Sequence, residues 1–260
     1  MTDINWDQLY DDALRWTREA GEYIKEKMKE SYSIDTKANQ NDLVTDVDKS
    51  VEQFFQQKIG EGYPEHRLMG EEGSHESIHD LTGVVWILDP IDGTINFVHQ
   101  ESFFAISLGI FHEGVGMIGI VYDVMNGELF TAQVGKGAYL NEKKLNKLSE
   151  VSFEESILSF NPRWILKNRG FEKLITESRA VRCYGSAAIE IAYVAAGKLD
   201  GYICNNLAPW DIAGGSVILA EVGGVSSNYD GGEQTYLKKD TFIAANPSIH
   251  RDVLKRVQNN

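Results

Sequence analysis

The sequence has no long hydrophobic run: nowhere do 18 apolar residues follow one another, so no membrane-spanning helix is predicted. Cysteine is scarce, and Cys183 and Cys204, 21 positions apart, match no zinc or redox spacing. We expect both thiols to be reduced, as is usual in a cytoplasmic protein. The first 12 residues are acidic and lack an apolar stretch, which disfavours a secretory signal.

Positive charge and proline are also in short supply. Lys and Arg total 25 against 39 Asp and Glu, and the net charge of −14 disfavours binding to nucleic acids or anionic membranes. A phosphate-bearing ligand would therefore need a local source of attraction. With only 5 prolines in 260 residues and no flexible linker, we expect one unit over residues 1–260, with subdomains of about 1–150 and 151–260.

The apolar residues that are present indicate a mixture of helices and strands. Helical spacing predicts a helix over about 3–30 and another after Asp46. The apolar run 84–88 predicts a buried strand that Asp89-Pro90 ends. Short apolar runs over 103–140, with a turn signal at Asn126-Gly127, predict an antiparallel meander.

The second half alternates the two kinds of element. A helix is predicted from about Ser186 to before Gly197, and a strand over 200–204. Two further helices are predicted to start near Pro209 and Pro247, where proline suits the first turn. The fold class is therefore α+β with stacked layers.

Four short acidic segments carry the chemistry of the chain. They are DLVTDVD (42–48), GEEG (70–73), DPIDGT (89–94) and WDIAGG (210–215). Asp89 and Asp92 follow the buried strand, at the end where open sheets usually bind ligands. Two carboxylates about 4 Å apart repel by ~4 kcal/mol at an effective dielectric of about 20, so a proton or a cation must join them. Oxygen donors without Cys or His favour Mg²⁺, and the N–H groups of Gly93 and Thr94 could bind an anion.

Each acidic segment also has a simpler interpretation. DPIDGT could be a surface turn, since Asp, Pro and Gly are common there. Asp211 could serve only the helix dipole, and Asp46 and Asp48 could lie on an exposed helix face. The presence of all four segments favours a shared site.

Together, in this order and spacing, the segments resemble those of the inositol monophosphatase family of magnesium-dependent, lithium-sensitive phosphatases. The resemblance covers nearly the whole chain. It implies an αβαβα sandwich of the sugar-phosphatase type and a hydrolase that acts on phosphate monoesters of small alcohols, first of all inositol 1-phosphate. It also implies two or three Mg²⁺ ions and a homodimer.

The resemblance assigns roles to particular residues of this chain. The implied metal ligands are Glu71, Asp89, the backbone carbonyl of Ile91, Asp92 and Asp211. The implied catalytic residues are Glu71, Asp48 and Thr94, with the last two paired to activate the attacking water. The implied substrate contacts are Lys37, Gly93, Thr94, Gly185, Ser186, Ala187, Cys204 and Asp211.

One departure from the family pattern concerns the substrate. Many inositol-specific members have a glutamate seven residues before the WD aspartate, where this chain has Cys204. A thiol is a poor partner for a sugar hydroxyl. The alternatives are NADP, fructose 1,6-bisphosphate and 3′-phosphoadenosine phosphates, with Arg163 and Arg182 available for a second phosphate, or an added regulatory role through protein contacts.

A competing motif is His75-Glu76-Ser77-Ile78-His79, which matches the HExxH pattern of zinc proteases. That chemistry needs both histidines on one face of a stable helix. The glycines at 70, 73 and 83 leave little room for such a helix, so we interpret the match as a coincidence.

Overall fold

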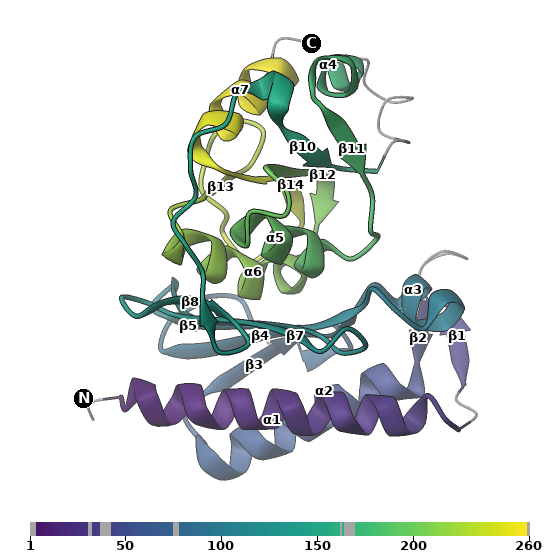
Figure 1. Ribbon diagram of the computed structural model, residues 1–260. Coiled ribbons are helices and arrows are strands. Elements are labelled where there is room, and N and C mark those ends of the chain that lie inside the picture. Colours follow the sequence, from purple (N-terminus) through teal and green to yellow (C-terminus); the bar gives the residue numbers. More distant parts are fainter. Residues whose placement is uncertain are drawn as a thin grey trace.

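The computed structural model describes residues 4–30, 33–36, 43–74, 78–161, 163 and 170–258. Its elements stack as helix, sheet, helix, sheet and helix (Figure 1), which confirms the predicted αβαβα sandwich. Within these described ranges, no helix combines the length and the apolar character needed to cross a membrane. Lys37, Asp42 and residues 75–77 lie outside the described residues.

The first sheet has seven strands in the order β3-β4-β5-β6-β7-β8-β9 and is antiparallel except for the parallel pair β3–β4. Its strands are β3 (Arg67–Gly70), β4 (Val84–Asp92), β5 (Ala105–His112), β6 (Val115–Asp123), β7 (Glu128–Gln133), β8 (Gly137–Leu140) and β9 (Lys143–Lys144). Strands β5 to β8 confirm the predicted meander. Helices α1 (Trp6–Lys27) and α2 (Asp46–Gly62) cover the outer face, and their apolar stripes bury residues such as Ile24 and Phe55.

The second sheet has five strands in the order β11-β10-β12-β14-β13. Its strands are β10 (Ile157–Ser159), β11 (Ala180–Arg182), β12 (Gly201–Leu207), β13 (Val225–Ser227) and β14 (Asp240–Ala245). Helices α4 (Gly170–Glu177) and α7 (Pro247–Gln258) pack on the outer side of this sheet. The remaining elements are β1 (Ile34–Thr36), β2 (Leu43–Thr45), α3 (Thr94–Gln100) and the 3₁₀ turn η2 (Phe153–Glu155).

Helices α5 (Ala187–Ala195) and α6 (Pro209–Glu221) fill the layer between the two sheets. All residues of α5 are buried, so the helix is enclosed on every side, and Glu190 is its single charged residue. Helix α6 lies directly on the first sheet: a Cβ on Gly214 would be 2.7 Å from the Ile120 carbonyl oxygen and 2.8 Å from that of Leu108. Close backbone packing therefore explains why glycine occurs inside this helix.

The strand that leads to the acidic motif continues further than the sequence predicts. Strand β4 runs through Pro90 to Asp92, and its pairing with β5 shifts register between Asp89 and Asp92. The prediction that Asp89-Pro90 ends the strand was wrong, because Pro90 lies in the irregularity, where no ladder N–H is required. The shift redirects the chain between the two aspartates. The division at about residue 150 stays a prediction.

Candidate metal centre and active site

Three aspartates from two elements converge at the edge of the first sheet. Asp89 and Asp92 come from the end of β4, and Asp211 comes from the first turn of α6. One carboxylate oxygen of each lies within 4.8 Å of the others. Asp89 and Asp92 are only 2% and 8% exposed. The structure thus brings together three of the four predicted carboxylate ligands.

Each aspartate has one oxygen that the backbone or a hydroxyl holds in place. Oδ1 of Asp89 accepts the Ile91 N–H at 3.0 Å, and Oδ2 of Asp211 accepts the Ala208 N–H at 2.7 Å. Oδ2 of Asp92 accepts the Ser186 hydroxyl at 2.5 Å and the Ala188 N–H at 2.7 Å.

The three carboxylates face one another without a directly bound basic side chain. Among the described residues none of them forms an ion pair within 4 Å, and Lys239 acts on Asp211 only through its charge. Carboxylate oxygens are the donors that Mg²⁺ prefers, so the residues present fit the ion.

The electrostatics of the cluster favour a bound cation. Burial, and then the charge of Glu71, raise the pKa of Asp89 well above its usual range. Burial and the charge of Asp92 do the same for the pKa of Asp211. Burial raises the pKa of Asp92 to about 6, although the bonds from Ser186 and Ala188 oppose this. A divalent ion would relieve both the repulsion and the desolvation cost.

Glu71 lies beside this group because β3 and β4 are parallel neighbours. Gly70 stands opposite Leu88 in the register, and the Glu71 N–H donates to the Leu88 carbonyl at 3.3 Å. Glu71 therefore follows β3 at the level of Asp89. After the register shift, the carbonyl of Ile91 accepts the Thr94 hydroxyl at 3.2 Å.

Asp48 is buried at the start of α2. Its Oδ2 accepts the Thr45 N–H at 2.9 Å and also the Thr45 hydroxyl, which forms a capping box. Burial, and then the charges of Glu72 and Glu71, raise the pKa of Asp48 to about 7. Among the described residues, Asp48 accepts hydrogen bonds from Thr45, and Thr94 donates one to Ile91. The pairing of Asp48 with Thr94 therefore stays a prediction.

A cavity of about 210 Å³ opens beside the aspartates. Its lining comprises Asp92, Asn161, Cys183, Gly185, Ala187, Glu190, Tyr202, Ile203, Cys204, Leu207 and Asp211. Four of the predicted substrate contacts thus lie together: Gly185, Ala187, Cys204 and Asp211. Ser186 is 1% exposed, and its hydroxyl donates to Asp92, so Ser186 holds one of the predicted metal ligands in place.

Comparison with known proteins places this site in a family. The sequence pattern of the inositol monophosphatase family matches residues 5–260. The chain belongs to the inositol monophosphatase family. It is 50% identical to inositol-1-monophosphatase of Bacillus subtilis over 256 residues, which are 96% of this chain and 97% of that protein.

Two solved structures extend the comparison. A staphylococcal inositol monophosphatase-1 in a LiCl-soaked inhibitory complex has a TM-score of 0.93 at 33% identity. The match covers 100% of this chain and 97% of the staphylococcal chain. An IMPase/NADP phosphatase complexed with Mg²⁺ and phosphate has a TM-score of 0.92 at 32% identity, covering 99% and 97%. As a member of this metal-dependent family, the chain is a phosphoric monoester hydrolase.

Two further buried carboxylates, which the sequence analysis does not single out, lie beside the candidate site. Glu52 of α2 accepts the Glu72 N–H at 2.6 Å and the Ser74 N–H at 3.0 Å, so it holds the loop that carries Glu71. Glu190 of α5 accepts the N–H groups of Tyr184 and Gly185. The available signal was a charged residue within the apolar stripe of each predicted helix.

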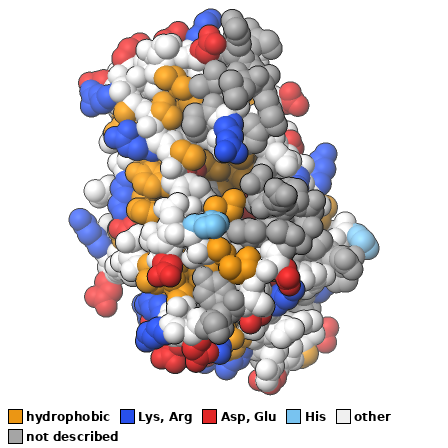
Figure 2. All heavy atoms as spheres, turned by 90° about the vertical axis from the view of Figure 1, so that its right-hand side faces the viewer, with side chains coloured by type: hydrophobic (Ala, Val, Ile, Leu, Met, Phe, Trp, Pro, Cys, Tyr) orange, Lys and Arg blue, Asp and Glu red, His pale blue; other side chains and the backbone are white. Residues whose placement is uncertain are grey.

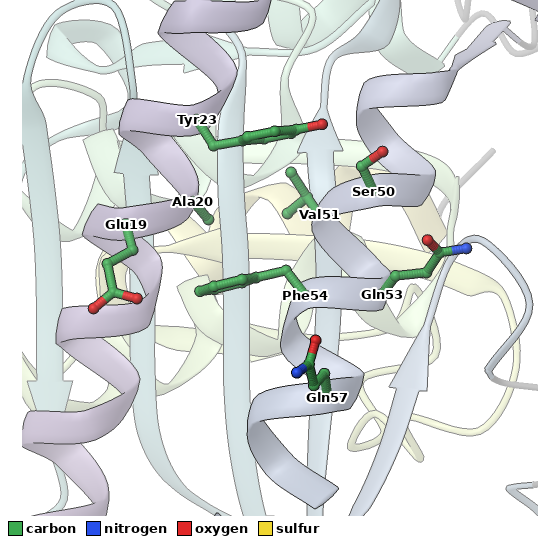
Figure 3. A pocket seen from close by; sticks show the side chains of 8 residues that line it. All are labelled: Glu19, Ala20, Tyr23, Ser50, Val51, Gln53, Phe54 and Gln57. Carbon is green, nitrogen blue, oxygen red and sulfur yellow. The ribbon is translucent and has the colours of Figure 1, made fainter. Parts of the chain in front are cut away.

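A second hollow lies on the outer helical layer. A groove of about 380 Å³ separates α1 from α2, and Tyr23 and Phe54 project into it from opposite sides (Figure 3). Its charged lining is Glu19, with no group of converging carboxylates. This groove therefore lacks the set of oxygen donors that the aspartates provide.

Proposed function

We propose that this chain hydrolyses phosphate monoesters of small alcohols, first of all inositol 1-phosphate, with Mg²⁺. The observation that carries the proposal is the convergence of three aspartate carboxylates, two of them buried, within 4.8 Å beside a cavity of about 210 Å³. The proposed ligands are Glu71, Asp89, the Ile91 carbonyl, Asp92 and Asp211. We propose two or three ions, a number that calorimetric stoichiometry measures.

The side chains around the ligands would complete the reaction. When bound, Mg²⁺ supplies an activated water and stabilises charge on the phosphate and the leaving oxygen. Asp48, whose pKa burial raises to about 7, would take the proton of the attacking water through the Thr94 hydroxyl, which would pass the proton on. The N–H groups of Gly93 and Thr94 would hold phosphate oxygens. Gly185 and Ala187 would line the space for the alcohol.

Bound divalent ions would explain how a chain with a net charge of −14 attracts a negatively charged phosphate substrate. Among the described residues on the face shown in Figure 2, acidic and basic side chains are intermingled and form no extended basic patch. Divalent ions would neutralise the buried carboxylates and present positive charge to the phosphate. Attraction then depends on the bound metal and is lost when a chelator removes it.

The decisive experiment is a phosphate-release assay with and without Mg²⁺ on four substrates: inositol 1-phosphate, fructose 1,6-bisphosphate, NADP and adenosine 3′,5′-bisphosphate. We expect Mg²⁺-dependent release, fastest from inositol 1-phosphate. Asp92→Asn should abolish turnover, while Asp230→Asn, a change at an exposed aspartate, should leave it unchanged. Wild-type kcat in Asp92→Asn, or equal activity in EDTA, would refute the proposal.

NADP is the second candidate substrate, because Cys204 lines the cavity with Tyr202, Ile203 and Leu207. This apolar part of the lining suits the adenine ring of NADP better than the hydroxyl groups of a polyol. Cys204→Glu would add a hydroxyl acceptor, and a hydrogen bond to a charged group contributes about 1.5–3 kcal/mol. If inositol 1-phosphate is the substrate, its kcat/KM should rise about tenfold or more relative to that of NADP. A preference for NADP in the wild type would favour the second candidate.

Three further proposals concern the enzyme as a whole. We propose a homodimer, which light scattering measures, and a cytoplasmic location, which cell fractionation measures. We also propose inhibition by lithium, in line with the LiCl-soaked complex of the staphylococcal relative. Sodium at the same ionic strength is the control, because it leaves screening unchanged.

A further inference from the structure

The turn formed by Tyr184, Gly185 and Ser186 connects β11 to α5 and lies against the metal-binding strand. Gly185 has a φ of +81°, a conformation that favours glycine. A Cβ placed on Gly93 would be 3.3 Å from the Gly185 carbonyl oxygen and 3.3 Å from the Ser186 Cβ. The position of this turn is therefore tightly coupled to the segment that follows Asp92.

Glu190 holds the turn from one side and Asn96 holds it from the other. Oε1 of Glu190 accepts the Tyr184 N–H and, at 3.2 Å, the Gly185 N–H. The Asn96 amide donates to the Tyr184 carbonyl at 2.7 Å. Glu190 is 3% exposed, and no ion pair among the described residues involves it. Because burying an unpaired carboxylate is unfavourable, these bonds to the backbone, together with the Ser159 hydroxyl, offset part of its cost.

The Tyr184–Ser186 turn also fixes Asp92, one of the proposed metal ligands. The Ser186 hydroxyl and the Ala188 N–H both donate to Oδ2 of Asp92, at 2.5 and 2.7 Å. These two bonds determine the plane of the carboxylate and thus the direction of its other oxygen. A displaced turn would rotate Asp92 without removing any ligand.

We propose that Glu190 is a positioning residue for the metal centre: it locks the Tyr184–Ser186 turn so that Ser186 holds Asp92 in the orientation that binds Mg²⁺. This inference rests on the proposed Mg²⁺-dependent phosphatase function. The role requires a hydrogen-bond acceptor at Oε1. It does not require a negative charge, so glutamine can replace Glu190 and alanine cannot.

The test compares Glu190→Ala and Glu190→Gln with the wild type. Calorimetric titration with Mg²⁺ alone measures metal affinity, and phosphate release from inositol 1-phosphate measures kcat and KM. Loss of a group that orients a metal ligand typically weakens metal binding about 10- to 100-fold. We expect that loss of Mg²⁺ affinity, with a lower kcat, in Glu190→Ala, and values within about threefold of wild type in Glu190→Gln.

Two further variants separate positioning from general destabilisation. Ser186→Ala breaks the last link of the chain and should weaken Mg²⁺ binding about tenfold even if Glu190→Ala does not fold. Asp200→Ala is the matched control. The Asp200 carboxylate also accepts a backbone N–H, that of Ile157 at 2.7 Å, but Asp200 does not line this cavity. This control variant should lower the melting temperature and leave Mg²⁺ affinity unchanged.

Three results would overturn the inference. The first is wild-type Mg²⁺ affinity in the folded Glu190→Ala or Ser186→Ala variant. The second is a Glu190→Gln variant as impaired as Glu190→Ala. The third is a raised KM with unchanged kcat in Glu190→Ala, which would indicate direct substrate contact. If the wild type releases no phosphate from any substrate but Glu190→Ala still weakens Mg²⁺ binding, the proposed function fails and the positioning role stands.

Discussion

Asp92→Asn should stabilise the metal-free protein while removing its response to Mg²⁺. Burial raises the pKa of Asp92 from 3.8 to about 6 in the folded state. The resulting penalty is absent below about pH 4 and complete above about pH 6, because only the ionised form is disfavoured. A pKa difference of one between the folded and unfolded states corresponds to about 1.4 kcal/mol, so the difference of about two destabilises the folded protein by about 3 kcal/mol at pH 8. An asparagine oxygen can still accept the bonds from Ser186 and Ala188.

The assay is thermal unfolding at pH 8 and pH 4, in EDTA and in Mg²⁺. For a chain of this size, 1 kcal/mol corresponds to about 2–4 °C, so Asp92→Asn in EDTA should melt up to about 6–12 °C above the wild type at pH 8. The two proteins should converge at pH 4, and Mg²⁺ should raise the melting temperature of the wild type alone. A variant less stable than the wild type in EDTA at pH 8, or one with an undiminished Mg²⁺ response, would refute this reasoning.

Other predictions concern packing and the loop that carries Glu71. Gly214→Ala should destabilise the protein by about 1–3 kcal/mol in urea unfolding, because its Cβ would meet the Ile120 carbonyl oxygen at 2.7 Å. Gly60→Ala, in an exposed turn of α2 with nothing within 4 Å, should instead stabilise it by about 0.5–1 kcal/mol, and equal effects would contradict the packing argument. Glu52→Ala should weaken Mg²⁺ binding about tenfold, since the N–H groups of Glu72 and Ser74 lose their acceptors, and Glu52→Gln should weaken it less, because its single amide oxygen can accept from only one side. Unchanged calorimetric affinity in Glu52→Ala would show that the loop needs no such support.

The sequence was sufficient for the layers and for the ligands that follow regular elements. The apolar run before Asp89 predicted the strand that carries this residue, and the proline before Asp211 predicted the start of a helix; both depend on local chemistry. The continuation of β4 through Pro90 was missed, because a register shift depends on the neighbouring strand.

The contacts that orient the ligands could not be predicted in this way. Ser186 and Asp92 are 94 positions apart, and no local pattern encodes their hydrogen bond. The bond between the Glu72 N–H and Glu52 likewise joins a loop to a helix 20 positions away. Such pairs form only when the layers stack, so they are properties of the tertiary fold.

The site therefore combines buried carboxylates in two different situations. Glu190 has an oxygen that backbone N–H groups occupy, which compensates its burial inside the chain. Asp89, Asp92 and Asp211 each have one oxygen held in this way, but their carboxylates also lie within 4.8 Å of one another. The held oxygen fixes direction, and the other remains electrostatically unfavourable until a cation binds. Because the fold bears that cost before binding, ligand reorganisation costs little when Mg²⁺ arrives, and the free energy of repulsion is recovered as metal affinity.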